Sequence, residues 1–219
     1  VNINGTLNCL HLSHMINVKK FIFSSSSSVY KGLENRSLIE DMKLEPLHPY
    51  GVGKLAGEHY CRLYNYLFGL ETLVLRYFSV YGPRQKGDIE HAGVIAKFFL
   101  QARENKDITI YGNGDQTRTF CYIDDNIDVT EEVVENDIWV NDVANVGSDV
   151  EISIIDLAQL IIDVTGSSSN IIHLPPLEEG DMTRRKPDIT KMNEVLGRDL
   201  TSLEDGILKL EKFYRKTYD

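Results

Sequence analysis

The chain has 219 residues, of which 42% are hydrophobic and 26% charged, so it can bury a substantial core without cross-links. Its 33 acidic residues outnumber the 23 basic ones, and the net charge of −10 argues against a general nucleic-acid or anionic-membrane surface. No apolar run reaches the roughly 18 residues that a membrane span needs. The three widely spaced cysteines, Cys9, Cys61 and Cys121, predict reduced thiols in a cytoplasmic protein.

Helix-length and strand-length patterns alternate along the chain. This alternation predicts an α/β fold with a mostly parallel sheet, and the irregular connections at 82–114 and 175–187 indicate a smaller second lobe. The expected helices span residues 2–17, 50–68, 94–104, 125–135 and 154–164, followed by two terminal helices, and the expected strands span residues 21–23, 71–77, 108–111, 140–146 and 171–174.

Cys9, His11 and His14 are the closest approach to a metal-ligand cluster. His11 and His14 share a helix face, but a metal site would need a fourth ligand or an open position. We therefore expect no metal site and assign these side chains to packing or solvent.

Three features suggest chemistry. The strand at 21–23 runs into five consecutive serines, Ser24–Ser28, and ligands bind at the carboxyl ends of strands in open α/β sheets. Tyr50 and Lys54 stand at a helix start with i, i+4 spacing, so both side chains share one face and the ammonium favours the phenolate of a general base. Either feature alone is weak, since a serine run also suits a flexible loop and roughly 0.65 such Tyr/Lys pairs are expected by chance. The third feature is a strand that enters a turn at Leu75–Arg84.

Four motifs occur in a fixed order: SSSSSVY at 24–30, HPYGVGKLAGE at 48–58, LRYFSVYGPRQ at 75–85 and YGNGDQTRTFCYIDD at 111–125. With them the chain resembles the extended short-chain dehydrogenase/reductase family of NAD-dependent epimerases and dehydratases, most closely its UDP-glucose 4-epimerase-like members. The resemblance covers almost the whole chain. It implies a Rossmann-like, doubly wound parallel sheet, with residues 1–80 in the NAD-binding domain. Residues 81–219 would form the substrate-binding lobe, from which about 115–147 return to the sheet.

The resemblance also implies roles for individual residues. Ser26, Tyr50 and Lys54 would be catalytic, with Ser26 on the sugar O4, Tyr50 as base and Lys54 on the nicotinamide ribose. The matching cofactor-binding positions are Asn2, Ser24, Ser25, Tyr50, Lys54, Tyr77 and Phe78, and the matching substrate-binding positions are Ser26, Ser79, Gly93, Val94, Thr109, Tyr111, Arg118 and Asp181.

The implied reaction is epimerisation of a nucleotide-diphosphate sugar, with a UDP-hexose as the expected partner. NAD would take hydride from C4 and return it to the other face of a 4-keto sugar, while the protein orients the sugar and supplies the base. For Arg118 there is an independent argument, because a guanidinium fork suits a pyrophosphate. The resemblance further implies a homodimer, paired through the helix at 2–17 and the helix of Tyr50, whose apolar residues include Leu55, Tyr60, Leu63, Tyr64 and Leu67.

Several departures from the family pattern leave alternatives open. No G-x-x-G-x-x-G turn occurs in the chain, so we expect the dinucleotide-binding start to be missing and the chain alone to be inactive.

Ser79 and Glu178 replace the usual Asn and Arg, and a carboxylate beside a diphosphate would repel it unless Arg184 or Arg185 compensates. Ser27 and Ser28 stand where sister dehydratases and decarboxylases have acids, which favours an epimerase. The alternatives are a 4,6-dehydratase or reductase of the same family, or a non-catalytic binding protein.

Overall fold

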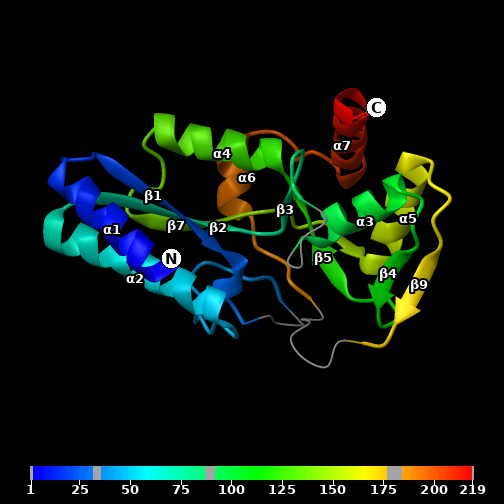
Figure 1. Ribbon diagram of the computed structural model, residues 1–219. Coiled ribbons are helices and arrows are strands. Elements are labelled where there is room, and N and C mark those ends of the chain that lie inside the picture. The colour runs from blue at the N-terminus through cyan, green and yellow to red at the C-terminus, as the bar shows by residue number, and fades with distance from the viewer. Residues whose placement is uncertain (1, 32–35, 87–91, 177–183, 219) are drawn as a thin grey trace. The chain divides into compact units, whose positions relative to one another are not determined.

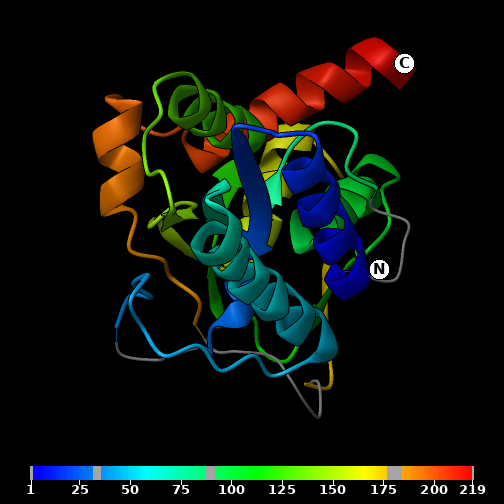
Figure 2. The same cartoon turned by 90° about the vertical axis from the view of Figure 1, so that its left-hand side faces the viewer.

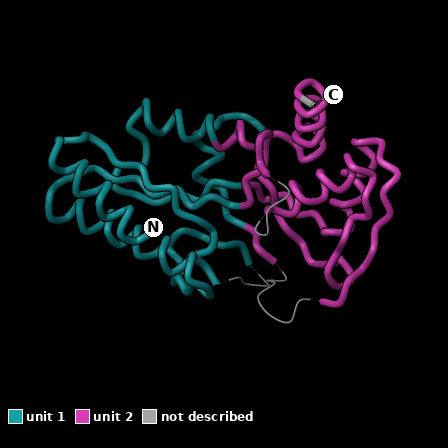
Figure 3. The backbone as a smooth tube through the Cα atoms, in the orientation of Figure 1, with its two compact units in different colours: residues 1–78, 127–147, 187–199 teal, residues 79–126, 148–186, 200–219 magenta. Residues whose placement is uncertain are grey.

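The computed structural model describes residues 2–31, 36–86, 92–176 and 184–218. The chain forms two compact units, coloured separately in Figure 3. Unit 1 comprises residues 1–78, 127–147 and 187–199, and unit 2 comprises residues 79–126, 148–186 and 200–219. The segments that return to unit 1 are thus 127–147 and 187–199, where the sequence suggested about 115–147.

Unit 1 is built on a three-stranded parallel sheet. Its strands are β1 (Lys20–Ser26), β2 (Glu71–Tyr77) and β7 (Asp142–Val146), in the order β1-β2-β7. The predicted α/β fold with a parallel sheet is confirmed. The register aligns Ser26 with Tyr77 and Tyr77 with Val146, so all three strands end at one carboxyl edge.

β1 is longer than the sequence indicated. We expected the strand to stop at Phe23, but its pairing with β2 continues through Ser24, Ser25 and Ser26. The ladder is formed by main-chain groups, which serine supplies as well as phenylalanine does. The next three residues, Ser27–Val29, form the short 3₁₀ helix η1.

Helices cover both faces of this sheet (Figure 1). One face carries α1 (Asn2–Met15) and α2 (Pro49–Phe68), and the other carries α4 (Ile123–Glu135, from residue 127 onward in unit 1) and α6 (Thr190–Leu196). Figure 2 shows α1 and α2 side by side. They run in the same direction, because a Cβ on Gly53 would contact Asn2 near their starts and His14 stacks on Phe68 near their ends.

α2 has clear end signals. The His48 side chain accepts a hydrogen bond from the Gly51 N–H at 3.2 Å, and Pro49 occupies the first turn, where a missing N–H costs nothing. At the other end Gly69 adopts φ 67°, a left-handed conformation that favours glycine. These signals explain why the sequence located this helix to within one residue.

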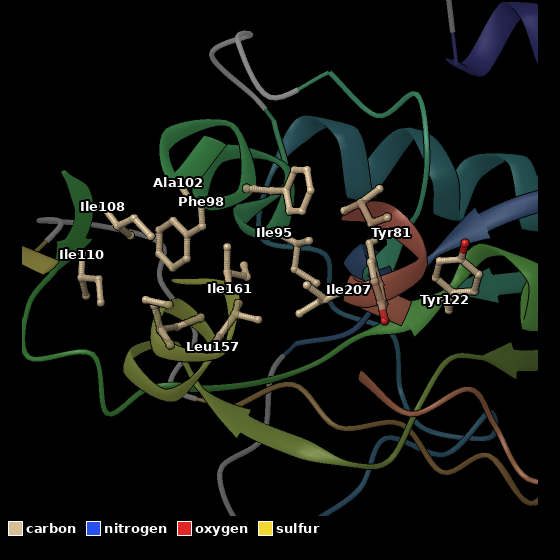
Figure 4. Close-up of a cluster of buried hydrophobic side chains, with 14 residues drawn as sticks. Tyr81, Ile95, Phe98, Ala102, Ile108, Ile110, Tyr122, Leu157, Ile161 and Ile207 are labelled. Atoms are coloured by element: carbon tan, nitrogen blue, oxygen red, sulfur yellow. The ribbon is translucent and has the colours of Figure 1, made fainter. Parts of the chain in front are cut away.

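Unit 2 packs α3 (Val94–Arg103), α5 (Ile154–Thr165) and α7 (Leu203–Tyr218) around one apolar cluster. Figure 4 shows Ile95 and Phe98 from α3 facing Leu157 and Ile161 from α5. Its strands pair in twos: β3 (Val80–Tyr81) with β6 (Cys121–Tyr122) and β4 (Ile108–Tyr111) with β9 (Ile171–Leu174), both parallel, and β5 (Thr117–Thr119) with β8 (Glu151–Ser153), antiparallel.

Several predicted boundaries differ from the structure by one to two residues. The expected strand 140–146 begins at Asp142, because Trp139 and Asn141 have positive φ values of 55° and 58°. The expected helix 125–135 begins at Ile123. The pairs formed by β3, β5, β6 and β8 were not predicted, since strands of two or three residues carry no readable alternation.

Two properties concern only the residues that the structure describes. None of the helices in these ranges combines the length and the apolar character needed to traverse a bilayer. Within the same ranges, no three His, Cys, Asp or Glu side chains are grouped so that they could hold a metal ion.

Candidate active site

The serine segment lies where β1 ends, at the carboxyl edge of the unit 1 sheet. Successive side chains of a strand point to opposite faces, and here Ser24 is exposed whereas Ser25 is buried. The Ser26 hydroxyl caps η1 by accepting a hydrogen bond from the Ser28 N–H at 3.2 Å. The three hydroxyls therefore have different surroundings, although they are adjacent in the sequence.

The first turn of α2 approaches this segment closely. A Cβ on Gly51 would lie 2.3 Å from the main-chain oxygen of Ser28, so only glycine allows the approach. Tyr50 precedes this glycine, and its side chain is 46% exposed. The predicted base thus stands beside the serine segment, with its side chain open to solvent.

Lys54 links α2 to the end of β1. Its Nζ donates a hydrogen bond to the Ser24 main-chain oxygen at 2.8 Å and lies 5.6 Å from the centre of the Tyr50 ring. Burial of the ammonium lowers the pKa of Lys54 below its ordinary value. The structure therefore brings together Tyr50, Lys54 and the serine segment.

The remaining cofactor positions of unit 1 have mixed surroundings. The Tyr77 hydroxyl lies 3.0 Å from Thr130 Oγ1; burial raises the pKa of Tyr77, and hydrogen bonds with Thr130 and Ser24 oppose that rise. The Phe78 side chain is fully buried and packs near Tyr30, with ring centres 5.9 Å apart. The Phe78 side chain is therefore part of the core, so Phe78 can contact a ligand only through its main chain.

A buried ion pair that was not predicted from the sequence pattern lies behind the serine segment. Arg76 donates to both carboxylate oxygens of Glu58, from Nε at 3.0 Å and from Nη2 at 2.7 Å. The Ser25 hydroxyl donates to Glu58 Oε1 at 2.5 Å. One sequence signal could have pointed to this ion pair: Glu58 follows Lys54 by four residues and so continues the i, i+4 spacing of Tyr50 and Lys54.

The predicted substrate residues that the structure describes lie in unit 2, apart from Ser26. Ser79 has φ 38°, a left-handed conformation, and its oxygen accepts a hydrogen bond from the Cys121 N–H at 3.3 Å. Arg118 lies on β5 and donates from Nη1 to the Thr117 oxygen at 2.7 Å. Asp181 and Glu178 fall outside the described residues. Gly93 is the N-cap of α3, and Val94 is its first residue. On β4 the Thr109 hydroxyl accepts a hydrogen bond from Gln101 Nε2 at 3.3 Å, and Tyr111, the last residue of the strand, is 45% exposed.

Arg184 is engaged with a carboxylate of its own unit. Its Nε and Nη2 donate to the two oxygens of Glu151 at 2.7 and 2.6 Å, and the Thr117 hydroxyl donates to the same carboxylate at 3.0 Å. The hydrogen bond from Arg184 lowers the pKa of Glu151 to about 2. The sequence offers Arg184 and Arg185 as residues that could compensate for Glu178, but this pairing directs the Arg184 guanidinium to Glu151.

Comparisons with known proteins agree on one family. A family model described as "NAD dependent epimerase/dehydratase family" matches residues 1–147. A Bacillus subtilis protein named as an uncharacterised UDP-glucose epimerase is 34% identical over 94% of this chain and 64% of its own length. A UDP-N-acetyl-alpha-D-glucosaminuronate decarboxylase of Bacillus cytotoxicus is 36% identical over 98% of the chain and 69% of its own length. The chain therefore spans about two thirds of the length of these relatives.

Solved structures show the same fold. The UDP-glucose 4-epimerase of Thermotoga maritima, solved with UDP-glucose, has a TM-score of 0.92 and 33% identity over 100% of this chain and 70% of that one. The UDP-glucuronic acid 4-epimerase of Bacillus cereus, solved with UDP-glucuronic acid and NAD, has a TM-score of 0.88 and 36% identity over 99% and 68%. Both similarities cover both units of the chain.

Proposed function

Because the chain belongs to the NAD-dependent epimerase/dehydratase family, we propose that it acts as a nucleotide-sugar 4-epimerase on UDP-glucose and UDP-galactose. The observation that carries the proposal is the arrangement of Tyr50 and Lys54 beside the serine segment, with the Lys54 ammonium held 2.8 Å from the Ser24 oxygen. The named activities of the Thermotoga and Bacillus relatives support the same reaction class.

The residues of unit 1 fit the nicotinamide end of NAD. The Tyr50 side chain and the Ser24 residue are exposed at the sheet edge beside Lys54, so hydroxyl and ammonium groups suited to ribose hydroxyls are clustered there. Asn2, Tyr77 and the Phe78 main chain would contribute further contacts, with Ser25 held behind them. When bound, NAD supplies the hydride acceptor and donor for C4 of the sugar.

The protein's own groups handle the proton and the orientation of the sugar. Tyr50 takes the O4 proton as general base, and the positive charge of Lys54 stabilises the phenolate. Ser26 hydrogen-bonds to O4 and orients the sugar. Tyr50 then returns the proton to O4 of the epimerised sugar, so the base is regenerated in each turnover.

In unit 2 we assign the UDP moiety to the residues that match the family's nucleotide positions. Arg118 would bind the diphosphate through its guanidinium, with Asp181 on the ribose side. The other assigned residues are Ser79, Gly93, Val94, Thr109 and Tyr111. The hydroxyls of Ser27 and Ser28 favour epimerisation over dehydration or decarboxylation, since neither residue supplies an acid for those reactions.

Tyr50→Phe tests the mechanism. We expect this variant of the full-length protein to lose about 10²- to 10⁴-fold in interconversion of UDP-glucose and UDP-galactose, because only the proton-transfer group is removed. The assay follows both sugars with NAD present. Tyr66→Phe on the same helix is the control, since Tyr66 is 84% exposed and outside the site.

Other outcomes would select the alternatives. Retained turnover in Tyr50→Phe would contradict the assigned base. Accumulation of a 4-keto-6-deoxy product would indicate a dehydratase. Failure of the full-length wild-type protein to bind NAD(H) at millimolar concentration would favour a non-catalytic binding protein.

We also propose a homodimer formed through α1 and α2. Of the five α2 residues expected to face a partner, Leu63 and Leu67 are exposed, whereas Tyr64 is buried in the core and Leu55 and Tyr60 are partly buried. Further exposed apolar residues on α1 and α2, or directly after α1, support such a face, since extended apolar patches mark interaction sites. They are Leu12, Met15, Ile16 and Tyr66.

Leu67→Glu tests the dimer. We expect a shift from dimer to monomer in light scattering, because a carboxylate would be buried in the interface. Val150→Glu is the control, since Val150 is 69% exposed and lies outside α1 and α2. A wild-type protein that is monomeric at the same concentration would contradict the proposal.

Finally, a cytoplasmic location is supported by the free thiols of Cys9 and Cys61, which suit a reducing compartment.

A further inference from the structure

The carboxylate of Glu58 is bound on two sides by elements that end at the candidate site. Ser25, on β1, donates a hydrogen bond to Oε1, and Arg76, on β2, donates to both oxygens. The side chains of Glu58 and Arg76 are only 9% and 5% exposed. Inside the protein such charge-assisted bonds are stronger and more directional than on the surface. Glu58 therefore fixes α2 to two neighbouring strands at once.

The spacing along α2 connects this carboxylate to the reacting groups. Tyr50, Lys54 and Glu58 follow one another at intervals of four residues, so they share one helix face. Lys54 contacts the main chain of Ser24, and Glu58 contacts the side chain of Ser25. Two consecutive residues of β1 are thus bound by two consecutive turns of α2. These contacts fix the position of the helix along the strand.

We propose that Glu58, held by Arg76 and bonded to Ser25, is a positioning residue that sets the register of Tyr50 and Lys54 against the serine segment. This inference rests on the proposed function, because it assigns the reacting groups to that segment. Glu58 touches no reacting atom in this scheme. It acts through Ser25, whose displacement would move Ser24 and Ser26 on either side.

Further contacts make the Arg76 anchor rigid. Nη1 donates to the Tyr30 hydroxyl at 2.7 Å and to the Glu40 main-chain oxygen at 2.9 Å. Four of the five guanidinium N–H donors are therefore used within unit 1. Burial raises the pKa of Tyr30 to about 12, so its hydroxyl stays protonated and donates to Asn145 Oδ1 at 2.8 Å. Because the Arg76 guanidinium is bound to Glu58, to Tyr30 and to the Glu40 main chain, it holds the Glu58 carboxylate in one orientation.

Two variants separate positioning from stability. Ser25→Ala removes the bond between strand and carboxylate but keeps the ion pair, whereas Glu58→Gln keeps an acceptor for Ser25 but removes the charge that Arg76 needs. Ser25→Ala remains informative if Glu58→Gln fails to fold. Val133→Ala is the matched control, because it opens a cavity at a fully buried α4 position outside these contacts.

The first readout is the titration of Lys54, followed by NMR of the ¹³C-methylated full-length protein and assigned by its loss in Lys54→Arg. Burial lowers the pKa of Lys54 in the wild type, so loosening α2 from β1 exposes the ammonium and raises that pKa toward its ordinary value. We expect this upward shift in Ser25→Ala and none in Val133→Ala. The second readout is turnover, where kcat should fall about 10- to 100-fold with KM within about twofold of wild type.

The two readouts distinguish this inference from the proposed function. A full-length wild-type protein without turnover, in which Ser25→Ala still shifts the Lys54 titration, supports the positioning role and refutes the epimerase. An active wild type whose Ser25→Ala variant keeps both kcat and the Lys54 titration overturns the positioning role. A loss of kcat with an unchanged Lys54 titration would also overturn the positioning role. An equal shift of the Lys54 pKa in Val133→Ala would overturn it as well.

Discussion

Arg76→Leu is expected to lower the free energy of unfolding by about 3–5 kcal/mol, because it leaves the buried Glu58 carboxylate without its cation. The wild-type Arg76 side chain is 5% exposed, and its guanidinium forms two bonds to that carboxylate. Leucine fills part of the volume but offers no donor. Urea denaturation of both proteins under identical conditions measures the difference.

The double variant Glu58→Leu/Arg76→Leu is the decisive comparison. Removing both charges eliminates the unpaired carboxylate, so we expect it to recover most of the stability that either single variant loses. The Ser25 hydroxyl still loses its acceptor, and full recovery is therefore not expected. Additive losses in the double variant would show that the two side chains do not stabilise the fold as a pair.

Local patterns explain how much of the candidate site the sequence predicted. Tyr50 and Lys54 were placed on one face by helix periodicity alone, and the helix itself was marked by Pro49 and Gly69 at its ends. The buried strand at 71–77 was readable from its apolar run and was found at the same bounds. Each of these predictions depends on residues that are close in the sequence.

The contacts that the sequence did not predict join residues that are far apart. Ser25 is 33 residues from Glu58, and Arg184 is 33 residues from Glu151. A lone carboxylate or guanidinium in a sequence does not show which partner the packing will bring to it. The extension of β1 through Ser26 likewise depends on its alignment with β2, because the polar serine run carries no strand pattern of its own.

Gly57→Ala is the second large effect, and it follows from the packing of α2 on the sheet. A Cβ on Gly57 would lie 2.3 Å from the Phe23 ring, with two further ring atoms at 2.8 and 3.0 Å. Phe23 is 7% exposed and packs within the unit 1 core, so its ring has little room to retreat. We expect destabilisation toward the upper end of about 1–3 kcal/mol, which exceeds the roughly 1 kcal/mol gained from alanine's helix propensity. Thermal and urea denaturation measure the loss.

Two further variants test this cause. Gly53→Ala adds the same methyl group to the same helix, but its nearest contacts would be the exposed Asn2 side chain at 3.2 Å and the exposed Ile3 side chain at 3.9 Å. Stability should therefore be unchanged or slightly higher. Phe23→Leu combined with Gly57→Ala should recover part of the loss, because the smaller side chain vacates the space. Since the Lys54 ammonium lies 5.3 Å from the centre of the Phe23 ring, displacement of that ring in Gly57→Ala should also disturb the candidate site. Equal losses in Gly53→Ala and Gly57→Ala would contradict the steric explanation.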